Sequence, residues 1–342
     1  MNRRILTLIV ALVPVLVLGV VGSVVTVPFV ALGPGPTFDT LGQVDDKQVV
    51  DVTGAPLDPT TGHLNMTTVS VRDELNLFEA FGFWVSGEHG LVPRAEVYPP
   101  EVSREEIDKS NQQEFKQSES NAEVAALNYL DMPTAVLVRG FGDDEGPADG
   151  VLETGDQLIR IDDTPINAPE DVIDLVAETP PGTTVTVDYR RGDAENSAPI
   201  TLAAHPEDPA KGFLGIMLGE GGRPPLQVEF NLADIGGPSA GLMFSLALID
   251  KLSPGELNGG RFVAGTGTID ETGKVGPIGG IQYKMMAARE VGAETFLVPA
   301  DNCNEARQRA PEGLRLVRVE TLDSAIASLA DIDAGREPIS CG

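Results

Sequence analysis

The feature that most constrains this chain is a long uncharged segment near its amino terminus. No residue from Ile5 to Phe38 is charged, and residues 5–32 are almost entirely Ile, Leu, Val, Ala and Gly. A helix needs about 20 such residues to cross the hydrocarbon core of a bilayer. Residues 1–36 are therefore expected to form a short cytoplasmic tip and a transmembrane anchor.

The charges on either side of this segment predict its orientation. Arg3 and Arg4 precede it, whereas the rest of the chain is acidic. The positive-inside tendency places the amino terminus in the cytoplasm, so the body of this single-pass cell-membrane protein would be extracytoplasmic. The alternative is a cleaved signal peptide, which would release a soluble secreted form. The apolar core of a signal peptide is usually about 7–15 residues, roughly half the length found here, which favours an uncleaved anchor.

The net charge argues against a nucleic-acid partner. The chain has 24 Lys and Arg against 52 Asp and Glu, which gives a formal charge of −28. Binding to phosphate backbones requires the opposite balance. With 342 residues, of which 42% are hydrophobic, the chain is long enough for two or three domains with real cores.

The two cysteines, Cys303 and Cys341, are too few and too far apart for a zinc module built from Cys-x-x-Cys pairs. We expect neither a metal nor a cofactor. In an oxidising exterior the two thiols could form a disulfide that ties the tail, residues 331–342, to the preceding domain. The alternative is two unrelated thiols.

The first part of the body, residues 37–130, is expected to be an α/β segment. It combines short strands and turns with a helical patch near Leu75, Leu77, Phe78 and Phe81. Residues 101–130 lack Pro and Gly and are rich in Glu, Gln and Ser, which predicts a polar surface helix whose charges face solvent.

Residues 131–206 have a different, strand-rich texture. Buried strands are predicted around residues 135–138 and 158–161, a helix over residues 169–177, and an alternating strand over residues 185–190. The segment resembles a bacterial PDZ domain through Gly146, Pro147, Ala148, Gly155, Asp156, Leu158, Ile159 and Ile161. The resemblance implies capture of extended peptide ends by strand addition. The alternative is a rigid packing module.

Residues 211–330 alternate strands and helices and contain the most reactive candidate, Ser239. The sequence Gly237-Pro-Ser-Ala-Gly241 leads into an apolar helix, so Pro238 is expected at the first helical position and Ser239 in the first turn. Unpaired N–H groups at a helix start favour an alkoxide or oxyanion. The string also fits the G-x-S-x-G elbow of α/β-hydrolases, which requires a later histidine. His63, His89 and His205 all precede Ser239, which excludes that order.

A desolvated lysine is the remaining candidate for the base, and only three lysines follow Ser239. Lys251 lies twelve residues further along the same helix, about 18 Å away. Lys274 lies in a predicted hairpin turn. Lys284 is early in a helix beside apolar Ile281, Met285 and Ala288, where lost hydration would lower its pKa. The alternative is a lysine whose head group reaches water.

Four ordered blocks resemble the proteolytic domain of the Lon family. They are Gly237-Pro-Ser-Ala-Gly241, Gly265-Thr-Gly267, Gly276-Pro-Ile-Gly-Gly-Ile-Gln-Tyr-Lys284 and Phe296-Leu-Val-Pro-Ala300. The resemblance implies that Ser239 is the nucleophile and Lys284 its general base, with Thr266 as a supporting residue that orients the lysine. It also implies an α+β proteolytic domain, polypeptide substrates and assembly into a homo-oligomeric ring such as a hexamer.

The chain departs from classical Lon in two respects. It has no G-x-x-x-x-G-K-[ST] phosphate loop, and Gly236 stands where many Lon enzymes have Asp; Asp234 is near but not equivalent. With the anchor and the PDZ-like segment, the chain looks like the membrane-anchored, ATP-independent Lon-like proteases of bacteria. The implied activity is a serine endopeptidase that cleaves unfolded or flexible extracytoplasmic proteins. The alternative is a non-catalytic membrane scaffold that binds exposed chain ends.

Overall fold

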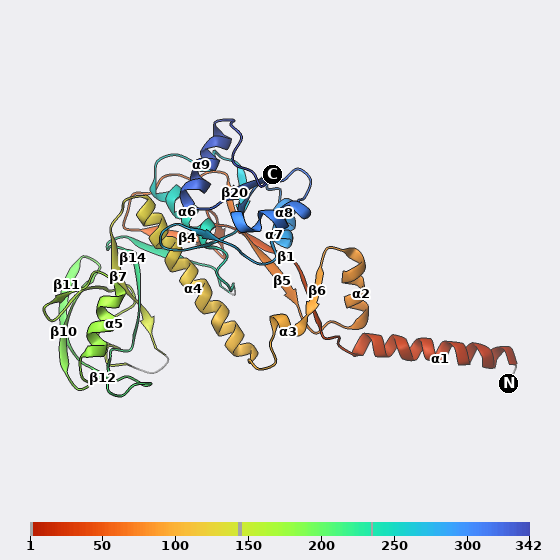
Figure 1. The fold of residues 1–342 in the computed structure, drawn as a ribbon, viewed down its shortest axis with the longest axis horizontal. Coiled ribbons are helices and arrows are strands. Elements are labelled where there is room, and N and C mark those ends of the chain that lie inside the picture. The colour runs from red at the N-terminus through yellow and green to blue at the C-terminus, as the bar shows by residue number, and fades with distance from the viewer. Residues whose placement is uncertain (1–2, 143–145, 234) are drawn as a thin grey trace.

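The computed structural model describes residues 3–142, 146–233 and 235–342, with side chains from residue 11 onward. The side chains of Arg3 and Arg4, and the whole of Asp234, lie outside this description. Helix α1 (Arg3–Val24) projects away from the body of the molecule (Figure 1). A search of the described residues for a helix with the length and apolar character needed to span a membrane finds none.

One mixed sheet forms the centre of the body. Its strand order is β20 (Arg315–Val319), β19 (Thr295–Pro299), β16 (Phe262–Gly265), β5 (His63–Arg72), β1 (Phe29–Asp39) and β6 (Gly90–Pro93). Neighbours from β20 to β5 are parallel, whereas β1 runs antiparallel to both β5 and β6. Helices on both faces bury the sheet, as parallel strands require.

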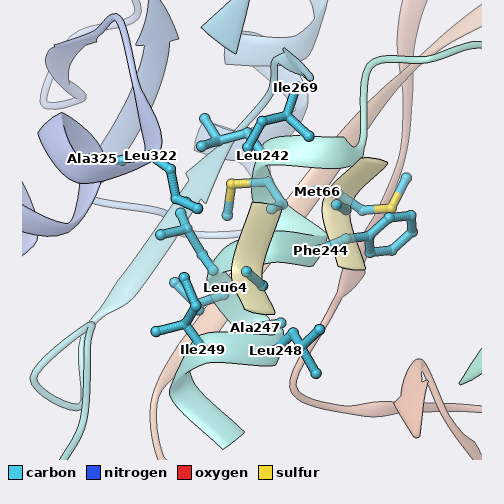
Figure 2. Packing of buried hydrophobic residues seen from close by; sticks show 14 of the residues in the cluster. Leu64, Met66, Leu242, Phe244, Ala247, Leu248, Ile249, Ile269, Leu322 and Ala325 are labelled. Atoms are coloured by element: carbon cyan, nitrogen blue, oxygen red, sulfur yellow. The ribbon is translucent and has the colours of Figure 1, made fainter. Parts of the chain in front are cut away.

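The two faces of the sheet pack against different helices. Leu64 and Met66 of β5 pack with α6 (Gly241–Leu252) and α9 (Leu322–Asp333), and Figure 2 shows these side chains around α6. On the other face Phe296 of β19 packs with α7 (Ile281–Glu290) and α8 (Cys303–Gln308). The strands and helices therefore hold α6 and α7 against opposite faces of one sheet.

The segments 37–130 and 211–330 share this sheet and one core, although the sequence suggests two separate units. Strand β5 pairs with β16 in parallel, from His63 opposite Phe262 to Met66 opposite Gly265. Phe115, from the first segment, is buried with Phe244 from the second. Pairing between strands so distant in sequence leaves no local pattern. The residue pattern therefore predicts separate units where the structure has one shared sheet.

The PDZ-like sheet is larger than the expected residues 131–206. Its order is β11 (Ala194–Thr201), β10 (Thr184–Arg191), β8 (Gln157–Ile161), β7 (Thr134–Phe141) and β14 (Ile216–Gly222), covered by α5 (Pro169–Glu178). Because β14 pairs with β7 along its whole length, residues 216–222 belong to this sheet and not to the segment that follows.

The long helix α4 (Arg104–Tyr129) joins the two halves (Figure 1). It begins with a capping box between Ser103 and Glu106. Its second half is buried, unlike the solvent-facing helix that the polar sequence predicts. The buried Glu123 accepts hydrogen bonds from Arg139 of β7 at 2.7 Å and from the Gly222 N–H at 2.7 Å. Glu123 therefore faces the PDZ-like half instead of water.

Short elements complete the described chain. They are β2 (Gln43–Val44), β3 (Lys47–Gln48), β4 (Val50–Thr53), α2 (Leu77–Ser86), α3 (Arg94–Val97), β9 (Thr164–Pro165), β12 (Ala203–Ala204), β13 (Gly212–Phe213), β15 (Gln227–Phe230), β17 (Thr268–Ile269), β18 (Val275–Gly276) and η1 (Ala300–Asn302).

Cys303 and Cys341 form a disulfide that holds the tail against α8. The bond closes a loop with a sequence separation of 38, for which chain-entropy arguments give a stabilisation of about 4 kcal/mol. Of the two alternatives that the sequence leaves open, the structure contains the disulfide.

Candidate active site

Two hydrogen bonds with α4 hold the loop that carries Ser239. Gly237 has a φ of +83°, a left-handed conformation that suits glycine, and its N–H donates to the Asn111 carbonyl of α4 at 2.9 Å. The Ser118 hydroxyl, also on α4, donates to the Pro238 carbonyl at 2.9 Å. Helix α4 thus fixes the backbone on the amino-terminal side of Ser239.

Ser239 lies just before α6 and not in its first turn. The helix begins at Gly241 with Ala240 as its N-cap, so Pro238 is not the first helical residue. The turn before the helix is stabilised instead by the Ser239 carbonyl, which accepts from the Gly267 N–H and the Thr266 hydroxyl, each at 3.0 Å. Within the described chain, the N–H groups of Ser239 and Ala240 meet no acceptor. As donors of the nucleophile and the residue after it, they are candidates for binding an oxyanion.

Lys284 reaches Ser239 from the opposite face of the sheet. It lies in the first turn of α7, which follows Gly280 in a left-handed conformation with φ +68°. Ile281 and Met285 are buried around it and anchor the helix. The Lys284 Nζ lies 2.7 Å from the Ser239 Oγ, 3.0 Å from the Thr266 Oγ1 and 3.0 Å from the Thr67 carbonyl oxygen. The structure therefore brings together Ser239, Lys284 and Thr266.

The surroundings of the lysine favour its neutral form. Its side chain is only 3% exposed, and burial lowers its pKa from an ordinary value of 10.5 to about 7. The hydrogen-bond partners of Nζ are hydroxyl and carbonyl groups, and no carboxylate is among them. With no opposite charge in contact to offset the lost hydration, the amine can serve as a base near neutral pH.

The hydrogen bonds also indicate the direction of proton transfer. The Thr67 carbonyl is only an acceptor, so it takes one N–H of the amine. The Thr266 hydroxyl donates to the Ser239 carbonyl, so its oxygen accepts the second N–H. A neutral amine has two N–H groups, and its lone pair is therefore left for the Ser239 O–H. In its neutral form the amine would therefore accept the hydrogen bond from Ser239, as a general base requires.

An open cleft of about 630 Å³ exposes this group to a substrate. Ser239 and Lys284 lie in its wall. The rest of the wall is largely apolar and comes from β1, β5, α4 and the loops before α6 and α7; it includes Pro36, Met66, Val69, Phe115, Ile235 and Ile278. Such a cleft can accept an extended chain and its apolar side chains.

The other candidate residues lie elsewhere. The Lys251 Nζ donates to Gln48 at 3.1 Å, and Lys274 is exposed in the hairpin of β17 and β18. None of the three histidines lines the cleft. Within the described residues no group of three His, Cys, Asp or Glu side chains is placed to hold a metal ion.

Three contacts of the site could not be found from the sequence. The Thr67 carbonyl binds Lys284 through a backbone atom, and any residue in that strand would supply one. Asn111 likewise acts through its carbonyl, and Ser118 is one of several serines in a polar helix. Ser118 could be assigned to the site only from the packing of α4 against the loop that carries Ser239, and the sequence does not show that packing.

Comparison with known proteins identifies two parts of the chain. The C-terminal proteolytic domain of Lon protease (S16) matches residues 234–330, and the PDZ domain matches residues 135–202. Lon protease of Heliobacterium modesticaldum is 41% identical over 93 residues, which are 26% of this chain and 11% of that protein. Lon protease of Roseiflexus castenholzii is 39% identical over 94 residues, with the same coverage. The chain thus spans about a tenth of the length of these relatives.

Among solved structures, the PDZ domain of an SdrC-like protein from Listeria monocytogenes is 30% identical to this chain. The match covers 25% of this chain and 86% of the Listeria domain, with a TM-score of 0.22. The matched Lon segment contains Ser239, Thr266 and Lys284. Residues 234–330 are a proteolytic domain of the Lon family, and residues 135–202 are a PDZ domain.

Proposed function

We propose that this protein is a serine endopeptidase with a Ser239–Lys284 dyad. The observation that carries the proposal is the 2.7 Å contact between the Ser239 Oγ and a buried lysine whose other contacts match a neutral amine. Thr266 would act as a positioning residue, because its hydroxyl links Nζ to the Ser239 backbone. The match of residues 234–330 to the Lon proteolytic domain supports these roles.

In the proposed reaction the Ser239 Oγ attacks the scissile carbonyl carbon while the Lys284 Nζ accepts its proton. The N–H groups of Ser239 and Ala240 stabilise the negative oxygen of the tetrahedral intermediate. The ammonium then returns the proton to the leaving amine as the peptide C–N bond breaks. Water hydrolyses the resulting ester, again with Lys284 as the base, and Ser239 is restored.

The substrates would be unfolded or flexible polypeptides, cleaved without ATP. The chain contains no phosphate-binding loop of the G-x-x-x-x-G-K-[ST] type, which supports independence from nucleotide. An open cleft with an apolar wall can bind extended chain but offers no means of unfolding a domain. A homo-oligomeric ring, for example a hexamer, is part of the proposal and rests on the resemblance to Lon.

The proposed location is the outer face of a cell membrane, with α1 as a single-pass anchor. The apolar sequence from Ile5 to Val24, where α1 ends, and the preceding Arg3 and Arg4 support this orientation. Large apolar side chains of α1, including Leu12, Leu16 and Leu18, are exposed in the isolated chain. The disulfide between Cys303 and Cys341 also fits an oxidising, extracytoplasmic compartment.

The PDZ domain is proposed to bind extended ends of substrate chains. A groove of about 470 Å³ runs between α5 and residues 212–218, beside the β14 edge of the sheet. Apolar side chains such as Val172, Val176 and Leu214 line it, which suits strand addition to an open edge.

A serine-directed fluorophosphonate would separate this function from a non-catalytic scaffold. We expect covalent labelling of Ser239, found by mass spectrometry of the peptide that contains it. Labelling should be lost in Lys284→Met and kept in Lys274→Met, which alters an exposed lysine outside the cleft. A full chain that binds peptide through its PDZ domain yet never labels at Ser239 across neutral and alkaline pH would be a scaffold.

Thr266→Val should reduce kcat by about 10- to 100-fold, because it removes one hydrogen bond to Nζ and one to the Ser239 carbonyl. Thr266→Ser keeps the hydroxyl and should retain most of the activity. The pH dependence of kcat should shift in Thr266→Val, since the amine loses a partner, and should return in Thr266→Ser. Equal losses in both variants with an unchanged pH profile would show a purely structural role.

A further inference from the structure

Helix α2 has a second apolar face that no part of the described chain covers. The side chains of Leu77, Phe78, Phe81, Trp84 and Val85 are between 54% and 69% exposed. Their spacing of i, i+1, i+4, i+7 and i+8 places them along one side of the helix. We call these five residues the aromatic face of α2.

The opposite side of α2 is already packed. Ala80 is buried with Ala31 and Leu75, and Phe83 and Leu91 lie against the same small cluster. A capping box between Asn76 and Glu79 fixes the start of the helix. The helix is therefore held in place without the aromatic face, and a helix that is apolar on both sides requires a second apolar environment.

The position of α2 is fixed relative to the end of α1. Thr26 and Asn76 form a β-bridge, and the Val27 N–H donates to the Leu75 carbonyl at 2.8 Å. The ring of Phe78 lies so close to Gly22 that a Cβ there would be 2.9 Å from it. Since α1 ends at Val24, only about 7 Å of chain separates that end from Thr26, the residue that pairs with Asn76 at the start of α2.

The length of α1 sets the depth at which this junction lies. Residues 5–24 form about 30 Å of helix, which equals the thickness of the hydrocarbon core. If α1 spans the bilayer, Val24 lies at the outer boundary between acyl chains and head groups. The aromatic face then lies at the depth where Trp and other aromatic side chains are enriched in membrane proteins.

We propose that the aromatic face of α2 inserts into the outer leaflet beside the anchor, so that the body of the protein docks on the phospholipid surface. The inference rests on the proposed anchor. A lipid partner is favoured because the aromatic face continues the exposed apolar surface of α1, through the contact of Phe78 with Gly22. Glu79 and Glu88 on and after the helix are exposed, so insertion should not depend on anionic lipid.

Trp84 makes the proposal directly measurable because it is the single tryptophan of the chain. The full-length protein would be reconstituted in phosphatidylcholine vesicles, with and without a nitroxide label placed shallowly on the acyl chains. We expect blue-shifted Trp84 emission that loses most of its intensity with the labelled lipid. The matched control is the double variant Trp84→Phe, Leu57→Trp, whose tryptophan replaces an exposed leucine in the loop between β4 and β5 and should not be quenched.

Flotation of the same vesicles separates this inference from the proposed anchor. Protein that does not float refutes the anchor and the inference together. Protein that floats with water-exposed, unquenched Trp84 keeps the anchor and overturns the docking of α2. Blue-shifted but unquenched emission also overturns it, because another protein surface, such as a second copy of the chain, would then cover the face. Phe81→Glu should reduce the quenching while the protein still floats.

Discussion

Replacing Ser239 by alanine is expected to lower kcat for an unstructured polypeptide such as casein by about 10⁴- to 10⁶-fold. The variant removes the oxygen that must form the covalent bond, and within the described chain Lys284 then has only the Thr266 hydroxyl and the Thr67 carbonyl as partners. The measurement is the appearance of casein fragments with the full-length protein. Thermal unfolding should be close to that of the wild type, because Ser239 is only half-buried.

The matched control for this variant is Ser197→Ala, which removes an exposed serine hydroxyl from β11 of the PDZ domain. It should cleave casein at the wild-type rate. Cleavage by Ser239→Ala at the wild-type rate would refute the assigned nucleophile, and the fragments would then have another source.

Lys284 gives the second large effect, which depends on pH. Because only the neutral amine can accept the serine proton, the rate should rise about tenfold per pH unit below pH 7 and level off above it, following the pKa of about 7. Lys284→Met should lose activity on the scale of Ser239→Ala. Lys284→Arg should be equally inactive, because a guanidinium stays protonated. Lys274→Met, in the exposed hairpin, should keep the wild-type profile, and a profile unchanged in Lys284→Met would exclude this lysine as the base.

The same pKa predicts a change in stability. Burial lowers the pKa of Lys284 to about 7 in the folded state, while the unfolded chain keeps a value near 10.5. Between these values the unfolded state binds a proton that the folded state does not, so the contribution of Lys284 to stability increases as the pH rises from 7 to 10. The difference in unfolding free energy between Lys284→Met and wild type should therefore shift by about 3–4 kcal/mol in favour of wild type across this range. Chemical denaturation at pH 6 and pH 10 would measure it.

The candidates for the base could be narrowed from the sequence because lysine is scarce. With three lysines after Ser239 and no later histidine, local context made Lys284 a candidate and the resemblance to Lon selected it; the structure places its Nζ 2.7 Å from the Ser239 Oγ. The helix boundary was less accurate, since α6 begins two residues after Ser239. Hydrogen bonds to the Ser239 carbonyl hold this turn outside the helix, and no sequence pattern around Ser239 indicates them.

The arrangement of the domains could not be predicted, because it depends on pairing across long stretches of chain. The helical patch near Leu77 and the strands around residues 135–138 and 158–161 are found as expected, since their patterns are local. The shared sheet of β5 and β16 and the buried second half of α4 are not local. A glutamate that pairs with a neighbouring domain, such as Glu123, has the same sequence signature as one that faces water.

The PDZ domain is inserted between the two parts of the catalytic sheet, and this has a consequence for biosynthesis. The Thr67 carbonyl, which holds the base, precedes Lys284 by 217 residues. During synthesis the amino-terminal strands emerge long before the partner strand that completes their pairing. The nucleophile and its base can meet only after nearly the whole polypeptide has been made. In the proposed peptidase a growing chain would therefore lack a complete site until these distant strands have paired.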